Sequence, residues 1–483
     1  MDSAQILTTS YTERTTIVEE DESLKNLTIP HTLTTIKTKP KLGVLLVGWG
    51  GNNGSTFTAG ILANKHNLEW ETKTGIHKAN YYGSYTQCVT TKVGIKLTED
   101  GKVEDQFRTI KDIVPTVDPN EIIIGGWDIS DLNIYESCRR AQVLEPSLTS
   151  QIKEQLQRMK PLKAAFNPEF VASNQTDRAD NVKVGTNREQ VEEIRNDIRQ
   201  FALGVDKVVV LWTANTEKYA ESIQTIPELE SLIEENASLP ASVLYAYASL
   251  MEGVVFLNGS PQNTLHPAIR SLAEQQKAFI GGNDFKSGQT KYKTMMGDFI
   301  IGAGIKATSV VSYNHLGNND GKNLSDPGTF RSKEISKASV LDDAIKSNKV
   351  LYPEAEPIDH IVVIKYCPFV GDSKRAMDEY SSQIFLNGSN TIVTYNICED
   401  SLLAAPIMID LVILAELFTR IQIDGKSLGP VLSYLSYFFK APITNHPEYV
   451  LNSFNTQKTL LTNFLKACAG IVPDDATLMN IHF

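Results

Sequence analysis

Four lysines in this acidic chain stand where an ammonium group could do chemistry. Lys333 and Lys337 are four residues apart and share one face if their segment is helical. Two adjacent ammonium groups repel each other, and a phosphate bound between them would remove that cost; the alternative is a solvated helix face. Lys374 and Lys440 lie just beyond apolar runs. Burial there would lower their pKa values and suit them to acid–base work.

A short run at residues 287–290, with the sequence SGQT, is a second candidate for binding an anion. It offers two hydroxyls, an amide and a flexible backbone, which together suit a phosphate nest. The alternative is a helix N-cap made by Ser287 or Thr290. The run at residues 318–321, NNDG, has the composition of a turn.

A glycine-rich loop at residues 48–54 follows the apolar run 42–47. Such a run is typical of a strand buried on both faces, and the glycines permit a tight turn. A helix that begins near Asn53 would direct its free N–H groups at the pyrophosphate of a dinucleotide. Gly48 and Gly50 match the G-x-G-x-x-G pattern, but Asn53 takes the third glycine position and Gly54 comes one residue late. The alternative is a turn without a ligand.

Strand-like and helical segments alternate after this loop. An apolar run at 121–124, a helical periodicity at 191–201 and a second apolar run at 208–212 predict a doubly wound α/β sheet. Such sheets bind ligands where their strands end. Asp128 follows the run at 121–124, where it could bind a ribose hydroxyl; the alternative is an Asp that caps the next helix.

The overall composition argues against several classes of protein. The chain has 483 residues and a net charge of −11, which disfavours nucleic acid and anionic membranes as partners. Its five cysteines are odd in number and widely spaced without a CxxC, so we expect reduced thiols, a cytoplasmic location and no zinc site. The run 402–421 is the most apolar long segment, but Asp410 and Glu416 within it indicate a buried helix, not a membrane span.

The character of the sequence changes near Gly281. Glycine, asparagine and lysine become frequent there, and the alternation of strand and helix is lost. Residues 1–40 are rich in threonine, and we expect an N-terminal arm that packs on the body or on a neighbouring subunit. No HExxH, GxSxG or P-loop lysine motif is present, so we expect no metal centre.

Six motifs together carry a family resemblance. They are GWGGNNG (48–54), LWTANTEKY (211–219), NGSPQNT (258–264), GGNDFKSGQTK (281–291), SYNHLGNNDG (312–321) and RSKEISK (331–337). In this order they resemble the myo-inositol-1-phosphate synthases of eukaryotic type, over residues 40 to 467. The departures are Lys218, where the family commonly has arginine, and Leu265-His266, where an aromatic and another residue are usual.

The resemblance implies a function and a fold. The family converts glucose 6-phosphate into inositol 1-phosphate with NAD, by oxidation at C5, enolisation at C6, aldol closure onto C1 and re-reduction. This reaction begins inositol and inositol-phospholipid synthesis. The implied fold is α/β, with a Rossmann-type doubly wound NAD-binding domain interrupted by an α+β catalytic and tetramerisation domain in a homotetramer. The implied division is an arm at 1–40, the NAD-binding domain at 41–290 and again at 403–483, and the inserted domain at 291–402.

The resemblance also assigns residues to roles. Lys333 and Lys440 would handle the C5 oxygen, Asp400 would orient a lysine or assist proton transfer, and the substrate phosphate could itself take the C6 proton. The substrate phosphate would be held by Ser287, Gly288, Gln289, Thr290, Lys337 and Lys374. The implied catalytic residues are Lys333, Lys337, Lys374, Lys440, Asp284 and Asp400. The implied NAD-binding residues are Gly51, Asn52, Asn53, Gly54, Asp128, Gln175, Arg178, Thr213, Ala214, Asn215, Thr216, Gly259, Ser260, Asp284, Ser287, Asn318, Asn319, Asp320, Lys333, Gly371, Asp372, Asp400 and Ser401.

Two other functions compete with this reading. An ordinary NAD-dependent dehydrogenase acting on a phosphorylated sugar would accumulate NADH in proportion to product. A non-catalytic dinucleotide sensor would turn over no sugar phosphate and would leave the lysines unexplained.

Overall fold

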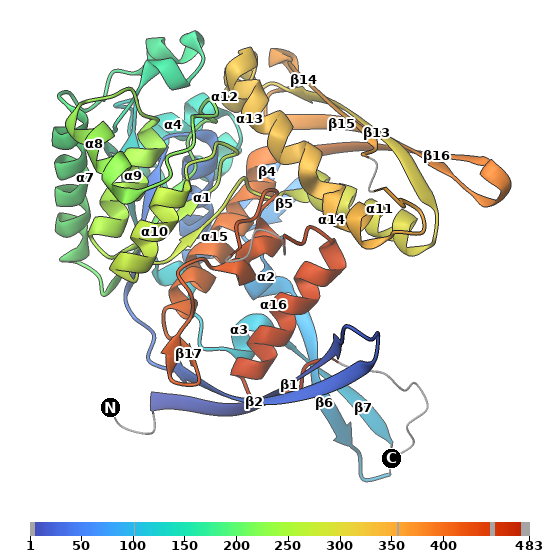
Figure 1. Ribbon diagram of the computed structural model, residues 1–483. Coiled ribbons are helices and arrows are strands. Elements are labelled where there is room, and N and C mark those ends of the chain that lie inside the picture. Colours follow the sequence, from blue (N-terminus) through green and yellow to red (C-terminus); the bar gives the residue numbers. More distant parts are fainter. Residues whose placement is uncertain (1–4, 101, 355–356, 445–449, 475–483) are drawn as a thin grey trace.

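A six-stranded parallel sheet forms the first part of the fold (Figure 1). The computed structural model describes residues 5–100, 102–354, 357–444 and 450–474. The strand order is β12-β11-β10-β3-β8-β9, and every neighbouring pair is parallel. The strands are β3 (Leu42–Val47), β8 (Ile123–Asp128), β9 (Leu162–Lys163), β10 (Lys207–Trp212), β11 (Val255–Asn258) and β12 (Ile280–Gly281).

The strand order reverses between β3 and β10. From β3 the chain runs outward through β8 to β9, then returns to the other side of β3 and continues through β10, β11 and β12. Loops that follow β3 and β10 therefore leave the sheet in opposite directions and open a crevice at their carboxyl ends. This is the doubly wound Rossmann-type arrangement that the sequence predicted.

Alternate residues of the strands enter two separate cores. Val44 and Leu46 pack in one core, with α1 (Asn52–Lys65) and α15 (Asp400–Phe418). Leu45 and Val47 pack in the other core, which contains side chains of the helices α7 (Asn187–Ala202), α8 (Ile226–Glu234), α9 (Ala241–Met251) and α10 (Pro267–Gln276). Because both faces are covered, the central strands are largely apolar, and their polar residues lie at strand ends.

Helix α15 is long and apolar enough to cross a membrane, but most of it is buried in the protein. Asp410 within it accepts hydrogen bonds from Ser84 Oγ at 2.7 Å and from the backbone N of Thr86 at 2.8 Å. Glu416 forms an ion pair with Arg420 at 2.6 Å. These buried polar contacts identify α15 as a core helix, as the sequence predicted.

A second, mixed sheet contains β13 (Lys306–Leu316), β14 (Asp359–Tyr366), β15 (Ser373–Gln383) and β16 (Ser389–Glu399). Its order is β14-β13-β15-β16, with only β13 and β14 parallel. Helices α11 (Gly288–Gly302), α13 (Pro327–Ala338) and α14 (Asp342–Ser347) lie along one face of it (Figure 1). The short helix α12 (Asn319–Asn323) follows β13.

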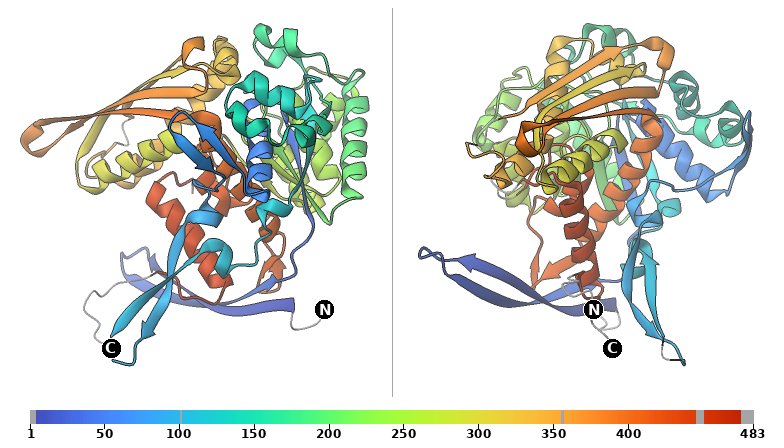
Figure 2. Two further views of the ribbon diagram at one scale, coloured as in Figure 1. Left: turned by 180° about the vertical axis from the view of Figure 1, so that it is seen from behind. Right: turned by 90° about the vertical axis from the view of Figure 1, so that its right-hand side faces the viewer.

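Two hairpins project at one end of the molecule (Figure 2). The first consists of β1 (Ile6–Val18) and β2 (Leu24–Ile36), and β2 also pairs with β17 (Ile421–Ile423) beside β18 (Lys426–Ser427). The second consists of β6 (Thr90–Leu97) and β7 (Val103–Thr109). The remaining elements include β4 (Glu69–Thr72), β5 (Gly75–Lys78), α2 (Tyr85–Cys88), α3 (Ile110–Ile113), α4 (Ile134–Ala141), α5 (Pro146–Thr149), α6 (Lys153–Arg158) and α16 (Phe454–Cys468).

One boundary differs from the sequence prediction. The apolar run at 121–124 was expected to be the strand, with Asp128 beyond its end. Instead β8 begins at Ile123 and Asp128 is its last residue. The chain before it forms a 3-10 turn, Pro119–Glu121, because Asp118 caps the turn by accepting a hydrogen bond from Asn120 N. That cap delays the strand by two residues.

Candidate active site

A cavity opens at the carboxyl ends of β3 and β10, where the strand order reverses. Its walls come from both sheets: the glycine loop and the ends of β8 and β10 on one side, and α13, β15 and the start of α15 on the other. The candidate residues that line it are Gly51, Asn52, Asn53, Asp128, Gln175, Arg178, Thr213, Ala214, Asn215, Thr216, Gly259, Ser260, Asp284, Ser287, Asn318, Asn319, Asp320, Lys333, Lys374, Asp400 and Lys440.

The glycine loop forms an open cradle at the N-terminus of α1. Gly48 has a φ of +88°, and a Cβ there would lie 2.6 Å from the Cα of Ala214. Only glycine therefore lets this loop approach the end of β10 so closely. Gly51 is the N-cap, no side chain caps the helix, and its first turn carries no acidic residue. The first amides of α1 are thus available to an anion, which fits a dinucleotide pyrophosphate.

Asp128 is buried at the end of β8 and faces the same cavity. Its Oδ1 accepts a hydrogen bond from Ser130 N at 2.9 Å. Helix α4 is capped by Asn133, so Asp128 does not have the helix-cap role that the sequence left open. Burial raises the pKa of Asp128, which Arg178 and Arg140 oppose. The Nε atom of Arg178 is buried without a hydrogen-bond partner among the described residues, as expected for a group that meets a ligand.

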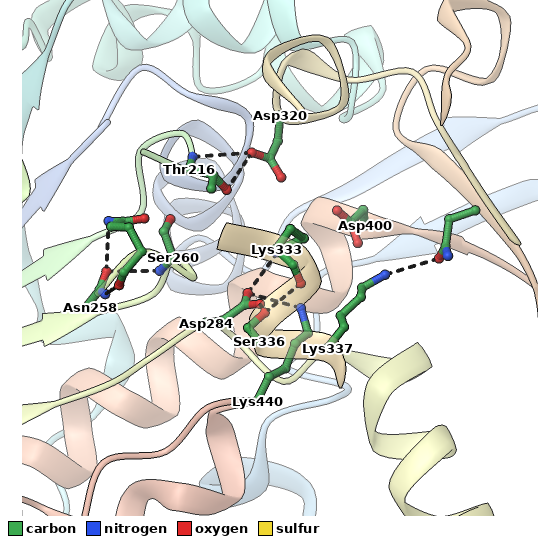
Figure 3. A network of polar contacts seen from close by, with 12 residues as sticks. Thr216, Asn258, Ser260, Asp284, Asp320, Lys333, Ser336, Lys337, Asp400 and Lys440 are labelled. Carbon is green, nitrogen blue, oxygen red and sulfur yellow. Dashed lines mark hydrogen bonds and ion pairs between the residues drawn. The ribbon is translucent and has the colours of Figure 1, made fainter. Parts of the chain in front are cut away.

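Asp284 lies between two lysines from distant segments (Figure 3). Its Oδ1 is 2.9 Å from Nζ of Lys333 and 3.1 Å from Nζ of Lys440, and its Oδ2 accepts a hydrogen bond from Ser336 Oγ at 2.6 Å. Burial would raise the pKa of this carboxyl, but Lys333 and Lys440 hold it well below its usual range. All of these side chains are buried.

The two lysines respond to this carboxylate in opposite ways. Burial tends to lower the pKa of both. For Lys333 the attraction of Asp284 and Asp320 wins, and its pKa is raised. For Lys440 burial wins, helped by repulsion from Lys333 and Lys374, and its pKa is lowered to about 7. One lysine is thus a fixed cation, whereas the other can exchange a proton near neutral pH.

A second ion pair lies at the start of α15. Nζ of Lys374 is 3.4 Å from Oδ1 of Asp400, the first residue of that helix. Burial would raise the pKa of Asp400, but Lys374, Lys440 and Lys333 lower it. Asp400 therefore stays ionised. It pairs with Lys374 and also interacts electrostatically with Lys333 and Lys440, the two lysines beside Asp284.

The candidate phosphate-binding residues gather at the N-terminus of α11. Ser287 takes the N-cap position, but its hydroxyl makes no capping hydrogen bond. Neither polar atom of the buried Gln289 carboxamide has a nitrogen or oxygen partner among the described residues. Lys337 is buried, with Nζ 3.4 Å from Oδ1 of Asn314. Burial and the repulsion of four other lysines lower the pKa of Lys337 well below its ordinary value. An anion bound here would relieve both costs.

Amide side chains connect the two halves of the cavity. Oε1 of Gln175 accepts hydrogen bonds from Asn215 at 2.8 Å and from Asn319 at 2.9 Å. Asp320 accepts a hydrogen bond from Thr216 Oγ1 at 3.3 Å (Figure 3). The cofactor crevice and the lysine-bearing part of the fold are therefore tied by side chains of both.

Some candidate residues do not line the cavity. Gly54 lies inside α1, where a Cβ would be 2.5 Å from the carbonyl oxygen of Trp49. Asp372 instead accepts hydrogen bonds from Ser401 N at 2.8 Å and from Asn318 Nδ2 at 3.1 Å, so it supports Asn318, which does line the cavity. The other candidates outside the lining are Gly288, Gln289, Thr290, Lys337, Gly371 and Ser401.

Sequence reasoning missed several residues of the cavity. Glu217 is buried there, and burial raises its pKa to about 7. It lies within the LWTANTEKY motif, which was a usable signal. Ala164, Ala165 and Phe166 also line the cavity, but such residues look like ordinary core positions in a sequence. Among the described residues, no group of three or more His, Cys, Asp or Glu side chains is placed to hold a metal ion.

Comparison with known proteins agrees with this geometry. A family model described as myo-inositol-1-phosphate synthase, of the NAD-binding kind, matches residues 42–466. Inositol-3-phosphate synthase 1 of Oryza sativa subsp. japonica is 52% identical over 92% of this chain and 89% of its own. Inositol-3-phosphate synthase 1 of Bos taurus is 49% identical over 99% of this chain and 88% of its own. The crystal structure of inositol-3-phosphate synthase from Caenorhabditis elegans has a TM-score of 0.95 and 45% identity, and it covers 99% of this chain and 96% of that one. The chain therefore belongs to the myo-inositol-1-phosphate synthase family.

Proposed function

We propose that this protein is an NAD-dependent inositol-3-phosphate synthase. It is an isomerase that converts D-glucose 6-phosphate into 1L-myo-inositol 1-phosphate without net oxidation, at the start of inositol and inositol-phospholipid synthesis. The observation that carries the proposal is the convergence of Lys333, Lys374 and Lys440, from three segments, on the cavity that the glycine loop enters.

NAD is the cofactor of this family, and the residues present fit it. The open N-terminus of α1 suits the pyrophosphate. Asp128 suits the adenosine ribose, together with Arg178, whose Nε has no hydrogen-bond partner among the described residues. When bound, NAD supplies the oxidation of C5 at the start and the reduction of the ring ketone at the end.

The lysines around Asp284 divide the proton transfer between them. Lys440, with a pKa of about 7, is the base that accepts the C5 hydroxyl proton. Lys333 keeps its proton and stabilises negative charge on the C5 oxygen, first as the hydroxyl ionises and later in the enolate. Asp284 holds the Nζ atoms of both lysines close together, so that both would meet the same substrate oxygen. After ring closure, Lys440 returns its proton to the same oxygen.

The other end of the cavity binds the substrate phosphate. Of the residues that would hold it, Ser287 and Lys374 line the cavity. Gly288, Gln289, Thr290 and Lys337 lie outside that lining and would add a second lysine, a second hydroxyl and a buried amide. A phosphate held there lies on the same substrate carbon, C6, that loses its proton, so the phosphate can take that proton. Lys374, paired with Asp400, then protonates the C1 oxygen as the enolate carbon attacks C1.

One assay tests the function. The protein is incubated with glucose 6-phosphate and a catalytic amount of NAD, and inositol phosphate and NADH are measured together. The proposal expects many turnovers of inositol phosphate for each NAD, with no lasting NADH. NADH that accumulates in proportion to product would indicate a dehydrogenase, and no turnover of any sugar phosphate would indicate a dinucleotide sensor.

A homotetramer is part of the proposal. The open face of the mixed sheet supports it, because Tyr313, Met377, Val393, Tyr395 and Ile397 are exposed there. An apolar sheet face of this kind is typical of a subunit interface. Light scattering on the purified protein should give four times the mass of one chain, whereas a monomer would contradict the proposal.

A cytoplasmic location and a division into domains complete the proposal. All five cysteines are free thiols, which supports a reducing compartment. The proposed boundaries are an arm at 1–40, a cofactor domain at 41–290 and 403–483, and an inserted domain at 291–402. They are supported by the start of α11 at Gly288 and of α15 at Asp400, on either side of the mixed sheet.

A further inference from the structure

A buried lysine that the mechanism does not use lies directly behind the phosphate-binding residues. Lys293 belongs to α11, one turn beyond Gln289, so the two side chains share a face of the helix. Only 4% of Lys293 is exposed, and it lies outside the lining of the main cavity.

The contacts of Lys293 hold an ammonium group in place without neutralising it. Nζ is 2.5 Å from Oγ of Ser312 and 3.2 Å from Nε2 of His360. Among the described residues, no carboxylate lies within ion-pair distance of it, although a buried lysine normally has such a partner. The acid whose charge acts on Lys293 is the buried Asp378, which stands opposite Ser312 on β15 and tends to raise the pKa of Lys293.

The covered face of the mixed sheet explains this position. Alternate residues of β13 point under α11 and α13, and they change from apolar Val310 to polar Ser312 and Asn314 toward the cavity. Ser312 holds Lys293, and Asn314 holds Lys337. The two side chains are thus fixed by residues two apart on one strand. Burial lowers the pKa of both lysines; repulsion from Lys374 adds to this for Lys293, and repulsion from Lys374 and Lys293 adds to it for Lys337.

We propose that Lys293 is a positioning residue of the phosphate-binding site, whose positive charge attracts the substrate phosphate from behind Lys337 and Gln289. The inference rests on the proposed function, since it takes the phosphate of glucose 6-phosphate as the anion. A lysine without a carboxylate partner is electrostatically incomplete until an anion arrives. A phosphate dianion at the N-terminus of α11 supplies the missing charge and favours the protonated form of Lys293.

Substitution of Lys293 by methionine separates charge from packing. Binding of inorganic phosphate and of glucose 6-phosphate is measured by calorimetry in the presence of NAD, and NAD binding is measured by itself. Lys293→Met should weaken the binding of phosphate and of glucose 6-phosphate about tenfold or more, because one buried charge near the anion is lost. NAD affinity and the melting temperature should stay close to the wild-type values. The matched control is Ser312→Ala, which removes a hydrogen bond of Lys293 but keeps its charge, and it should bind phosphate nearly as well as wild type.

Two results with Lys293→Met and Ser312→Ala would overturn the proposal. The first is a phosphate affinity of Lys293→Met equal to that of wild type. The second is an equal loss of phosphate affinity in Lys293→Met and Ser312→Ala together with weaker NAD binding, which would indicate a structural role. If Lys293→Met does not fold, Lys293→Arg serves instead. Burial lowers the pKa of Lys293 to about 8, so wild-type phosphate affinity should fall as the pH rises above 8. The arginine variant should show a smaller fall, because its guanidinium stays protonated.

Titratable groups around Lys293 can also affect how phosphate affinity depends on pH. Lys293 faces His360 on β14, Asp378 and Lys374 on β15, and Lys337 on α13. An equal fall in wild type and Lys293→Arg would assign the effect to Lys337 and contradict the proposal. A failure of the proposed function is distinguishable, because it would abolish inositol phosphate formation in wild type while phosphate binding could still be compared between variants.

Discussion

Lys333 and Lys440 donate to the same oxygen atom, Oδ1 of Asp284, at 2.9 Å and 3.1 Å. Lys333 comes from α13 under the mixed sheet, and Lys440 from the segment that follows the 3-10 turn Ser433–Phe438. A single carboxylate cannot neutralise two buried ammonium groups, so one of them gives up its proton more easily. That inequality provides a base and a cation side by side, which is what oxidation of an alcohol and stabilisation of the enolate of the resulting ketone require.

The first prediction concerns Asp284. Asp284→Asn removes the carboxylate that two buried lysines share, so Lys333 loses the largest of the attractions that raise its pKa. Turnover should fall by about 100-fold or more, on the scale found when an oxyanion-stabilising group is removed. Steady-state formation of inositol phosphate is the measurement. The control is Ser336→Ala, which removes the hydrogen bond from the Ser336 hydroxyl to Oδ2 of Asp284 but keeps the carboxylate. Its turnover should fall far less.

The second prediction concerns pH. Lys440 must be neutral to accept the C5 hydroxyl proton, and its pKa is lowered to about 7. The rate of the first NADH transient should therefore rise as the pH increases through 7 and then level off. Stopped-flow absorbance across this range is the measurement. A rate that does not change between about pH 6 and pH 8 would remove Lys440 from the role of base.

The third prediction links stability to ligand binding at Lys337. Its pKa in the folded protein lies well below that of the unfolded chain, so folding releases a proton and costs free energy at neutral pH. This cost disappears as the pH rises through the pKa that Lys337 has in the unfolded chain. Lys337→Met should therefore melt at or above the wild-type temperature without ligand, whereas glucose 6-phosphate should raise its melting temperature less than it does for wild type. Thermal unfolding of both proteins with and without glucose 6-phosphate is the measurement. A large fall in the melting temperature of Lys337→Met without ligand would contradict the account.

The fourth prediction concerns cofactor choice. Asp128 faces the cavity, and the charges of Arg178 and Arg140 both act on its carboxyl. Its negative charge would repel the 2′-phosphate of NADP. Asp128→Ser should lower the affinity for NAD and raise the affinity for NADP. The ratio of the two affinities should therefore fall by about tenfold or more. Titration of each cofactor by fluorescence measures this, and an unchanged preference would place the ribose elsewhere.

Local sequence patterns identified much of this fold. The apolar run at 42–47 and the glycine loop predicted a buried strand that opens onto a helix, and α1 begins at Asn52, next to the expected Asn53. Those features depend on neighbours in the chain, so sequence alone reveals them. The strand order and the return of α15 to the first sheet depend on packing between distant segments. Local patterns did not specify them, and only the family resemblance implied that the chain returns to the first domain at 403–483.

The candidate site was less predictable from residues alone. The spacing of Lys333 and Lys337 made them candidates, but a pair of lysines four apart is usually a solvated face, and only the family resemblance favoured a binding site. Lys293 looked like an ordinary polar residue of a helix, because the polar band of Ser312 and Asn314 that surrounds it forms only when β13 passes beneath α11. Burial of a charged side chain is a tertiary property.

The account depends most on the joint action of Lys333 and Lys440 beside the cofactor. Single-turnover mixing of the NAD-bound protein with glucose 6-phosphate tests it most directly, with NADH absorbance and inositol phosphate recorded together for wild type, Lys333→Met and Lys440→Met. We predict a transient NADH signal in wild type that disappears as inositol phosphate forms, and no transient in either variant. A normal transient in either variant, or NADH that persists alongside product in wild type, would contradict the account.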